Sequence, residues 1–248
     1  MNPGTLDRYY RQMIIEGWGE RAQAILAESS VAIVGAGGLG SAASMYLAAA
    51  GVGRLVICDF DVVEESNLNR QLLHAEASIG RPKAESACDT LRRINSRVDT
   101  VAVTERITDA TIAEAADGCA VLIDCLDNLE TRYVLNRYSV ACGKPLVHAG
   151  LHGMNGQITV FQPGRGPCLA CIFPEIDDEL SSGPIPVVGA AVGVISSMQA
   201  LETLKLLTGL GTPLSGRLLI YNGLEAAFES VEIAKDPSCP VCGGIRRN

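Results

Sequence analysis

The stretch VAIVGAGGLG at residues 31–40 decides the fold of this chain, because an apolar run that ends in a glycine-rich loop is typical of a strand followed by a helix. The glycines allow a tight turn and a close approach of the backbone to a phosphate, which the N-terminal N–H groups of the helix then bind. Asp59 ends the next predicted strand, 19 residues beyond the last glycine, where a carboxylate binds ribose hydroxyls. A glycine-rich turn kept only for packing is the alternative. We therefore expect a nucleotide site at Gly35, Gly37, Gly38, Gly40 and Asp59.

Apolar runs and amphipathic segments alternate along the first two thirds of the chain. Strand-like runs lie at residues 31–34, 54–58, 98–104, 120–125, 145–150 and 156–161. The apolar residues of 82–95 recur at helical spacing, and Pro82 suits a first helical turn. Because strands that alternate with helices need crossover connections, the pattern predicts an α/β fold with a Rossmann-like, doubly wound, largely parallel sheet. After about residue 156 the alternation fades, and short strands near 217–221 and 226–233 predict a partly antiparallel extension.

The length sets the domain organisation. At about 150 residues per domain, 248 residues correspond to between one and two domains. No repeat and no low-complexity linker divides the chain, so we expect a single unit. We divide it into an N-terminal helical arm (1–28), a nucleotide-binding core (29–155) and a C-terminal part that carries the partner-specific features (156–248).

The composition and charge exclude several classes of protein. With 48% hydrophobic residues and 26 glycines, the chain is neither disordered nor a disulfide miniprotein. Twenty basic residues against 28 acidic ones give a net charge of −8, which argues against a nucleic-acid surface and favours a basic protein partner. The uncharged residues 29–53 and 180–201 are interrupted by glycine or proline, so neither stretch predicts a membrane span. Because the first residues carry charge and no apolar run, we expect no secretory signal and a cytoplasmic location.

Two polar segments follow the acid and distinguish between kinds of nucleotide. SNLNRQ at 66–71 and RPK at 81–83 supply four hydrogen-bond donors: Asn67, Arg70, Gln71 and Lys83. A hydride-transfer site has no use for so many donors beside its phosphates, whereas a triphosphate and its departing pyrophosphate need fixed cations. The pattern therefore favours ATP over a nicotinamide cofactor. For Arg70 or Lys83 alone, a solvated polar loop is the ordinary alternative.

The segment DCLDN at residues 124–128 follows another predicted strand. Its polar side chains are therefore expected at the carboxyl edge of the sheet, where ligands bind. Asp127 is a candidate ligand for Mg²⁺, which prefers few carboxylates together with phosphate oxygens. The alternative is that Asp127 caps the helix predicted from about Leu129.

Four of the nine cysteines form two C-x-x-C pairs: Cys168, Cys171, Cys239 and Cys242. Pairs set 68 positions apart suit a tetrahedral zinc site that ties two distant segments together. Four cysteine ligands leave no open position, so we predict a structural and not a catalytic zinc ion; redox motifs are the alternative. The other five cysteines lie mostly in apolar runs and predict small core residues. The three histidines show no metal-ligand spacing, and we expect them to make ordinary hydrogen bonds.

Taken in this order, GAGGLG, Asp59, SNLNRQ, RPK, DCLDN and the two C-x-x-C pairs resemble the ThiF/MoeB/HesA family, the bacterial relatives of ubiquitin-activating E1 enzymes. The resemblance runs from RYYRQ at 8–12 to CPVCGG at 239–244, and the segment 199–209 looks closer to ThiF than to MoeB. It implies that residues 1–248 form one E1-like adenylation domain, with carrier binding and the zinc knuckles in 156–248.

The resemblance also implies a reaction and its partners. ATP would activate the C-terminal glycine carboxylate of a ubiquitin-like, β-grasp sulfur-carrier protein ending in Gly-Gly as an acyl-adenylate, with release of pyrophosphate. The activated carrier would serve sulfur incorporation in cofactor biosynthesis, of the thiamine type by preference and of the molybdopterin type as the alternative. A sulfurtransferase or a cysteine desulfurase would be a further partner.

Family roles can be transferred to this sequence by match of motif. The resemblance implies these ATP-binding positions: Gly35, Gly37, Gly38, Gly40, Asp59, Asp61, Ser66, Asn67, Arg70, Gln71, Lys83, Asp127 and Asn128. Of these, Arg70, Lys83 and Asp127 would be catalytic, the last through Mg²⁺. Arg11 resembles a catalytic arginine that reaches the phosphates of the other subunit, so the family implies a homodimer. Cys168, Cys171, Cys239 and Cys242 match the family's zinc ligands.

One loop departs from the family pattern. Family members often carry a cysteine before the apolar helix that corresponds to 188–208, and in ThiF-like proteins this cysteine links to the carrier. Here the loop holds Ser181 and Ser182, and a serine forms neither a persulfide nor a disulfide. We expect that this enzyme stops at the adenylate and that another protein supplies the sulfur. Two alternatives of another class stay open: a nicotinamide dehydrogenase, and a scaffold that binds a partner but not ATP.

Overall fold

The computed structural model describes residues 3–174 and 185–244 and contains one eight-stranded sheet in the order β3-β2-β1-β4-β5-β6-β7-β8. The strands are β1 (Ser30–Val34), β2 (Arg54–Cys58), β3 (Asp99–Val103), β4 (Val121–Asp124), β5 (Leu146–His152), β6 (Asn155–Phe161), β7 (Arg217–Asn222) and β8 (Ala227–Glu232). Neighbouring strands from β3 to β5 pair in parallel, and those from β5 to β8 pair antiparallel. The predicted doubly wound, largely parallel sheet with an antiparallel extension is confirmed.

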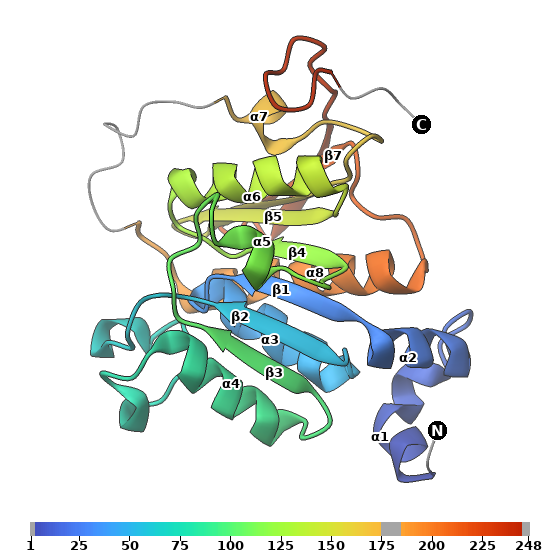
Figure 1. The fold of residues 1–248 in the computed structure, drawn as a ribbon, viewed down its shortest axis with the longest axis vertical. Coiled ribbons are helices and arrows are strands. Elements are labelled where there is room, and N and C mark those ends of the chain that lie inside the picture. The colour runs from blue at the N-terminus through green and yellow to red at the C-terminus, as the bar shows by residue number, and fades with distance from the viewer. Residues whose placement is uncertain (1–2, 175–184, 245–248) are drawn as a thin grey trace.

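The helices occupy the crossovers of the parallel half and frame the sheet (Figure 1). The main helices are α1 (Pro3–Met13), α2 (Gly19–Glu28), α3 (Gly38–Ala50), α4 (Lys83–Ile94), α5 (Ile112–Ala115), α6 (Leu129–Cys142), α7 (Leu169–Ile172) and α8 (Gly189–Thr208). Two 3₁₀ turns, η1 (Glu65–Asn67) and η2 (Glu76–Ser78), lie between β2 and α4.

Alternate residues of the central strands face two separate hydrophobic cores, as the two-residue period of a strand requires. Val31 and Ile33 of β1 pack with helices α3, α4 and α8, whereas Ala32 and Val34 pack with α5 and α6. Because both faces are covered, β1 is buried from Val31 to Val34 and reads as a continuous apolar run. This explains why the sequence identified the parallel strands so directly.

Helix α8 is the one helix of the described residues that is long and apolar enough to cross a membrane, by length and composition alone. It packs against α3, β5 and β6, and Ile195 lies so close to β6 that a Cβ on Gly156 would come within 2.5 Å of it. Residues 185–188 lead into this helix, whose buried residues include Ile195, Gln199 and Thr203. Helix α8 is therefore the layer that joins the parallel and antiparallel halves.

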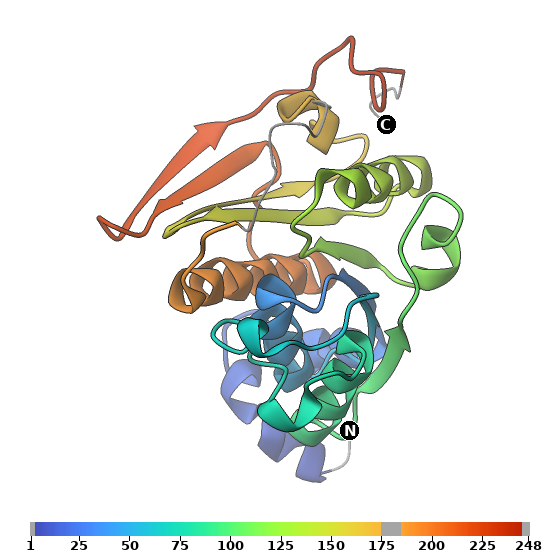
Figure 2. The same ribbon diagram turned by 90° about the vertical axis from the view of Figure 1, so that its left-hand side faces the viewer.

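The antiparallel half is much more open than the parallel half. Figure 2 shows β7 and β8 as a hairpin at the outer edge of the sheet. Every residue of β8 is exposed, whereas every residue of β4 is buried. Of the five cysteines expected in the core, Cys142 is exposed at the end of α6, and the other four are buried.

Candidate functional site

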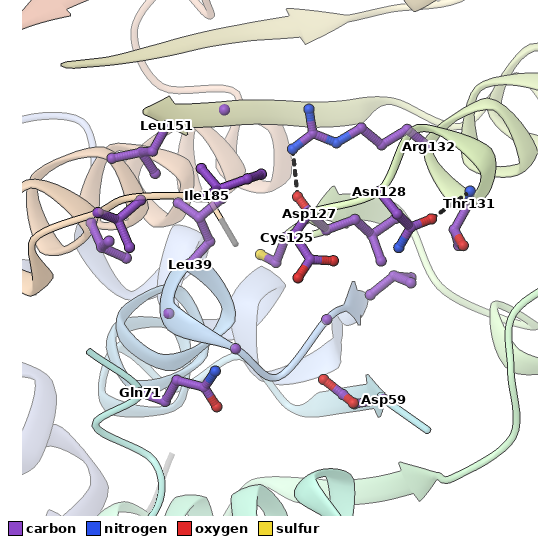
Figure 3. Close-up of a pocket in the computed structure, with 18 of the residues that line it drawn as sticks. Leu39, Asp59, Gln71, Cys125, Asp127, Asn128, Thr131, Arg132, Leu151 and Ile185 are labelled. Carbon is purple, nitrogen blue, oxygen red and sulfur yellow. Dashed lines mark hydrogen bonds between the residues drawn. The ribbon is translucent and has the colours of Figure 1, made fainter. Parts of the chain in front are cut away.

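A cavity of about 820 Å³ lies at the carboxyl ends of the parallel strands, beside the start of helix α3 (Figure 3). The sheet order changes direction here, because β2 lies on one side of β1 and β4 on the other. Such a switch point leaves a crevice at the strand ends, and ligands of open α/β sheets bind there. On the far side the cavity reaches Gly150, Gln157 and Ile220, which face one another across β5, β6 and β7. One site therefore touches both halves of the sheet.

The glycine loop is built for close approach, but its glycines have different roles. Gly35 has φ +102°, and a Cβ there would lie 2.4 Å from the carbonyl oxygen of Cys125. A Cβ on Gly40 would lie 1.9 Å from the carbonyl oxygen of Gly35. Gly37 and Gly38 line the cavity at the N-terminus of α3, where no side chain caps the helix. The first N–H groups of α3 are therefore available to an anion, and Gly40 serves packing behind them.

Asp59 lies beside this loop with both carboxylate oxygens in use. Its Oδ2 accepts a hydrogen bond from the N–H of Ala36 at 2.7 Å, and its Oδ1 accepts one from the N–H of Asp61 at 2.9 Å. Burial raises the pKa of Asp59, and the charge of Lys83 opposes that shift. The carboxylate thus fixes the glycine loop against β2 and also lines the cavity.

The cations predicted from SNLNRQ and RPK reach the cavity. Lys83, at the start of α4, is buried, and its Nζ lies 3.1 Å from Oδ2 of Asp61. Arg70 lines the same cavity and donates from Nη1 to the backbone oxygen of Ser66 at 2.9 Å. Gln71 is buried, and its Oε1 has no hydrogen-bond partner among the described residues. Lys83 is therefore not part of a solvated polar loop, and Arg70 is a half-buried residue of the cavity wall.

The DCLDN segment contributes to the opposite side of the cavity (Figure 3). Asp127 is exposed there, and within residues 3–174 and 185–244 no hydrogen bond or ion pair occupies its carboxylate. Asn128 lines the cavity too, and its Oδ1 accepts a hydrogen bond from the N–H of Thr131 at 3.0 Å. Asn128 is thus the N-cap of α6, and the alternative that Asp127 caps this helix is wrong.

Four predicted site residues do not line the cavity: Arg11, Gly40, Ser66 and Asn67. Asn67 is buried in η1, where its Oδ1 accepts a hydrogen bond from the N–H of Glu64 at 3.1 Å. Ser66 is exposed and donates to the carboxylate of Glu64. These two residues shape the loop that carries Arg70. Arg11 lies on α1, whose Tyr9 packs on Gly51 at the C-terminal end of α3, the end away from the cavity.

Asp124, expected from DCLDN at the carboxyl edge of the sheet, lies at the junction of β4, β5 and β6. It meets three residues there that were not predicted as site residues: Arg132, His148 and Gln157. Asp124 and His148 are buried opposite each other on β4 and β5, and Nδ1 of His148 lies 2.6 Å from Oδ2 of Asp124. Nε of Arg132 lies 3.5 Å from the same oxygen. Arg132 and Gln157 both line the cavity. The sequence held one signal for Arg132: it is a charged residue one helical turn after Asn128, which caps α6 just beyond the end of β4. Nothing in the sequence indicated that Arg132 would pair with Asp124.

The four C-x-x-C cysteines meet at the far end of the sheet from the N-terminus. Their sulfur atoms all lie within 4.8 Å of one another, with Sγ–Sγ distances of 3.6 Å for Cys168 and Cys239 and 3.4 Å for Cys171 and Cys242. A tetrahedral site with zinc–sulfur bonds of 2.3 Å requires sulfur atoms about 3.8 Å apart. The cluster therefore fits zinc, and it joins the segment at α7 to residues 239–242.

The surroundings of the cluster also suit thiolate ligands. Nδ2 of Asn136 lies 3.7 Å from the sulfur of Cys168, and Oδ1 of Asn136 accepts a hydrogen bond from the N–H of Leu169. Burial raises the pKa of Cys168 to about 11 and also raises that of Cys242. For Cys239, hydrogen bonds from the N–H groups of Cys242 and Val241 and from the thiols of Cys168 and Cys171 together outweigh burial and lower the pKa to about 7. N–H donors that favour a thiolate are a common outer shell of metal sites.

A family model described as the ThiF family matches residues 9–241. The chain belongs to the ThiF family. The resemblance drawn from the order of its motifs is therefore confirmed, and ThiF-family proteins among its relatives can be compared with it directly.

Two relatives illustrate the similarity. The chain is 44% identical over 240 residues to "Adenylyltransferase and sulfurtransferase MOCS3" of Sus scrofa, covering 95% of this chain and 53% of that protein. It is 43% identical over 244 residues to "SAMP-activating enzyme E1" of Haloferax volcanii, covering 96% of this chain and 89% of that protein. The chain spans about half the length of the MOCS3 relatives that it matches.

Solved structures share the fold. The crystal structure of E. coli MccB with MccA-N7isoASN aligns with a TM-score of 0.86 at 23% identity, covering 95% of this chain and 75% of that one. The structure of E. coli MccB with ATP aligns with a TM-score of 0.86 at 24% identity and covers 95% of this chain. At this identity the likeness shows that the ThiF-family sheet and its helices are arranged in the same way.

Proposed function

We propose that this ThiF-family chain is an ATP-dependent adenylyltransferase that activates the C-terminal glycine carboxylate of a ubiquitin-like sulfur-carrier protein. One observation carries the proposal: a single cavity joins a phosphate-type glycine loop and two cations, Arg70 and Lys83, to the open antiparallel strands. The relatives named adenylyltransferase and E1 support the same reaction. The nucleotide would occupy the parallel end, and the carrier tail would enter over β5 to β7.

The reaction requires alignment and charge neutralisation more than covalent chemistry. A carboxylate oxygen of the carrier attacks the α-phosphorus of ATP, a new P–O bond forms, and the bond to the departing pyrophosphate breaks. The helix N-terminus at Gly37 and Gly38, Arg70 and Lys83 would hold the phosphates and stabilise the charge on the leaving group. Lys83 would give up its ion pair with Asp61 and form one with the phosphates instead. Asp59 would accept a hydrogen bond from a ribose hydroxyl while its contacts with the glycine loop remain.

Asp127 is the proposed ligand for Mg²⁺. Its carboxylate is exposed to the cavity and is not engaged by other described residues, which is the state that a metal ligand needs. Mg²⁺ takes few protein carboxylates together with phosphate oxygens, so a single aspartate beside the phosphate loop fits it. When bound, the ion would neutralise phosphate charge.

The zinc site is proposed as a structural element. Cys168, Cys171, Cys239 and Cys242 fill all the positions of a tetrahedral ion and leave none for a substrate. The ion would fasten residues 239–242 to α7, beside helix α6.

A homodimer would explain the position of Arg11. The cavity lies at the N-terminal end of α3, and Tyr9 contacts the other end of this 13-residue helix, about 20 Å away. Arg11 on the same arm is therefore far from its own cavity. Tyr10 and Ile14 on this arm are each 60% exposed, which is typical of a surface covered by a partner. We propose that Arg11 reaches the phosphates of a second copy.

The source of sulfur lies with another protein in this proposal. Ser181 and Ser182 stand where a carrier-linking cysteine was sought, and they lie outside the described residues. The chain would release or pass on the acyl-adenylate to a sulfurtransferase or a cysteine desulfurase. The printed name of the MOCS3 relatives joins an adenylyltransferase with a sulfurtransferase.

ATP–pyrophosphate exchange with a panel of purified carriers tests the function. Each carrier, of thiamine type or molybdopterin type, is assayed with its Gly-Gly end intact and with the terminal glycine removed. Exchange that requires one intact carrier supports adenylation and selects between the two types, of which the thiamine type is preferred. ATP binding without exchange for any carrier would favour a scaffold, and NADH fluorescence enhancement without protection by ATP would favour a dehydrogenase.

A further inference from the structure

Two side-chain nitrogens converge on the bare backbone of Gly150 inside the cavity. A Cβ at Gly150 would lie 3.4 Å from Nε2 of Gln157 and 3.7 Å from Nη1 of Arg132. The three residues line the cavity together, and Figure 3 shows Arg132 beside β5. Among the described residues, no hydrogen bond occupies Nη1 of Arg132 or Nε2 of Gln157. The missing side chain thus leaves a space bordered by two N–H donors, one of them charged.

The rest of the Arg132 guanidinium is already fixed. Its Nη2 donates to the backbone oxygen of Leu126 and, at 3.0 Å, to that of Ala149. Its Nε lies 3.5 Å from Oδ2 of Asp124, and its side chain is only 14% exposed. Since the guanidinium is planar, these contacts leave Nη1 as the edge that faces the cavity.

Asp124 is in turn held by His148. Asp124 is fully buried, and its Oδ1 accepts a hydrogen bond from the N–H of Leu126 at 3.0 Å. His148 lies between the rings of Phe161 and Phe173, with centroid distances of 5.9 and 5.5 Å. Burial lowers the pKa of His148, so the imidazole is neutral and donates from Nδ1 to Asp124. This pair supplies a fixed negative charge behind Arg132.

The geometry points to a carboxylate subsite: Arg132 Nη1 and Gln157 Nε2 bind the C-terminal carboxylate of the incoming peptide, and the Asp124–His148 pair positions Arg132. This inference rests on the proposed function and names where its acceptor is held. Arg70 and Lys83, whose N–H groups would bind the phosphates, lie between β2 and β3. Gly150 and Gln157 instead pair with each other in the antiparallel strands, in a row that continues through Ile220 to Glu229. A glycine tail without side chains fits against the bare backbone of Gly150.

Calorimetry without ATP separates carboxylate recognition from catalysis. The probes are the Gly-Gly carriers of the exchange panel, each with its native carboxylate and as a semisynthetic C-terminal amide. We expect amidation to weaken binding to the unaltered protein by about tenfold or more, because it removes a charge-assisted hydrogen bond. The variants Arg132→Lys and Gln157→Leu are expected to bind the carboxylate form more weakly and to lose most of the discrimination. Arg137→Lys, on the same helix and paired with Asp109, is the matched control and should retain it.

Two further substitutions test the space and the positioning pair. Gly150 has no positive φ, so Gly150→Ala is compatible with the strand and fills the space between the donors. We expect it to raise the KM for the carrier while ATP binding is unchanged. His148→Asn keeps an N–H donor for Asp124 and should restore most of the discrimination that His148→Leu loses. A purely structural role of His148 would instead lower stability in both variants without separating carboxylate from amide.

The binding and exchange measurements together separate the carboxylate subsite from the adenylyltransferase activity. Discrimination without pyrophosphate exchange would leave the subsite in place and overturn the adenylyltransferase. Exchange with one carrier, but equal affinity for its carboxylate and amide forms, would overturn the subsite and leave the function. Loss of discrimination in Arg137→Lys as well as Arg132→Lys would also overturn the subsite, because the effect would then not depend on the contact over Gly150. Equal binding of both forms together with no exchange would overturn both proposals.

Discussion

The parallel half and the antiparallel half of the sheet are built from the same kind of strand but use it differently. In the parallel half, β4 is buried on both faces, and the backbone turns at the strand ends hold Asp59 and the glycine loop. In the antiparallel half, β8 is exposed throughout. The parallel half therefore fixes its backbone groups around the cavity, whereas the antiparallel half leaves its outer strand open to solvent.

The cavity lies where the two halves meet, and its polar groups divide in the same way. Arg70 and Lys83 belong to the segment between β2 and β3 in the parallel half, with Lys83 at the start of α4, and Gln157 belongs to an antiparallel strand. Asp127 and Arg132 lie between them, on the loop after β4 and the first turns of α6. A reaction between a nucleotide and a protein tail needs such a shared border.

Asp127→Ala should have the largest effect: it should lower the rate of pyrophosphate exchange without changing the stability of the fold. Loss of a group that fixes charge in the transition state typically lowers a rate by about 10²–10³-fold, and we expect pyrophosphate exchange to fall by at least that much. Because Asp127 is exposed, thermal unfolding should not change. The control is Glu130→Ala, an exposed acid in the first turn of α6 that does not line the cavity. Exchange retained in Asp127→Ala would remove this residue from the mechanism.

Loss of zinc should destabilise the antiparallel half and leave the affinity for ATP unchanged. In Cys239→Ser, or after chelation, residues 239–242 lose their fastening to α7, and we expect the free energy of unfolding to fall by about 3 kcal/mol or more. Zinc content and calorimetric unfolding measure this change. Cys142→Ser removes an exposed thiol and is the control. ATP affinity that falls together with the zinc content would show that the halves are not separable.

Two helix glycines should respond to alanine with opposite signs. Gly40→Ala in α3 forces a Cβ to 1.9 Å from the carbonyl oxygen of Gly35, so we expect a loss of about 1–3 kcal/mol or more in unfolding free energy. Nothing lies within 4 Å of a Cβ at Gly193 in α8. Gly193→Ala should therefore stabilise the protein by about 0.5–1 kcal/mol through helix propensity. Denaturant titration of both variants checks the sign, and a stabilised Gly40→Ala would contradict the tight packing of the loop.

The sequence could predict the parallel half well because its strands are buried on both faces. A run such as VAIV needs no partner to be recognised, and the residues at its end follow from chain direction. The spacing of the glycines, however, could not separate Gly37 and Gly38, which face the cavity, from Gly40, which packs behind it. That difference depends on the turn at Gly35, which places the carbonyl oxygen of Gly35 beside Gly40.

The border between the halves was the part that the sequence could not predict. Asp124 and His148 are 24 positions apart, and only the β4–β5 register sets them side by side. Histidine hydrogen bonding was expected and is confirmed for His148 and His74, but not which carboxylate His148 would meet. Asn128, expected at the nucleotide site, lines the cavity, and its Oδ1 also caps α6, a role that the sequence offered to Asp127.

The smallest predicted effect compares one buried histidine from each side of the cavity as the pH falls. His74 donates from Nε2 to the carbonyl oxygen of Ala36, and burial lowers its pKa and that of His148 below the ordinary value of 6.5. Below pH 6.5 the histidines of the unfolded chain bind protons that the buried histidines of the folded chain do not. The free energy of unfolding therefore rises as the pH increases toward 6.5, and above that pH the histidines cause no further change. Each histidine contributes a slope of at most about 1.4 kcal/mol per pH unit. Urea titrations between pH 5 and 7.5, the range around the pKa of about 6.5, should show the slope reduced in His74→Gln and in His148→Asn but not in the exposed-site control His152→Gln. If only His148→Asn flattened the profile, acid sensitivity would belong to the border between the halves and not to the nucleotide loop.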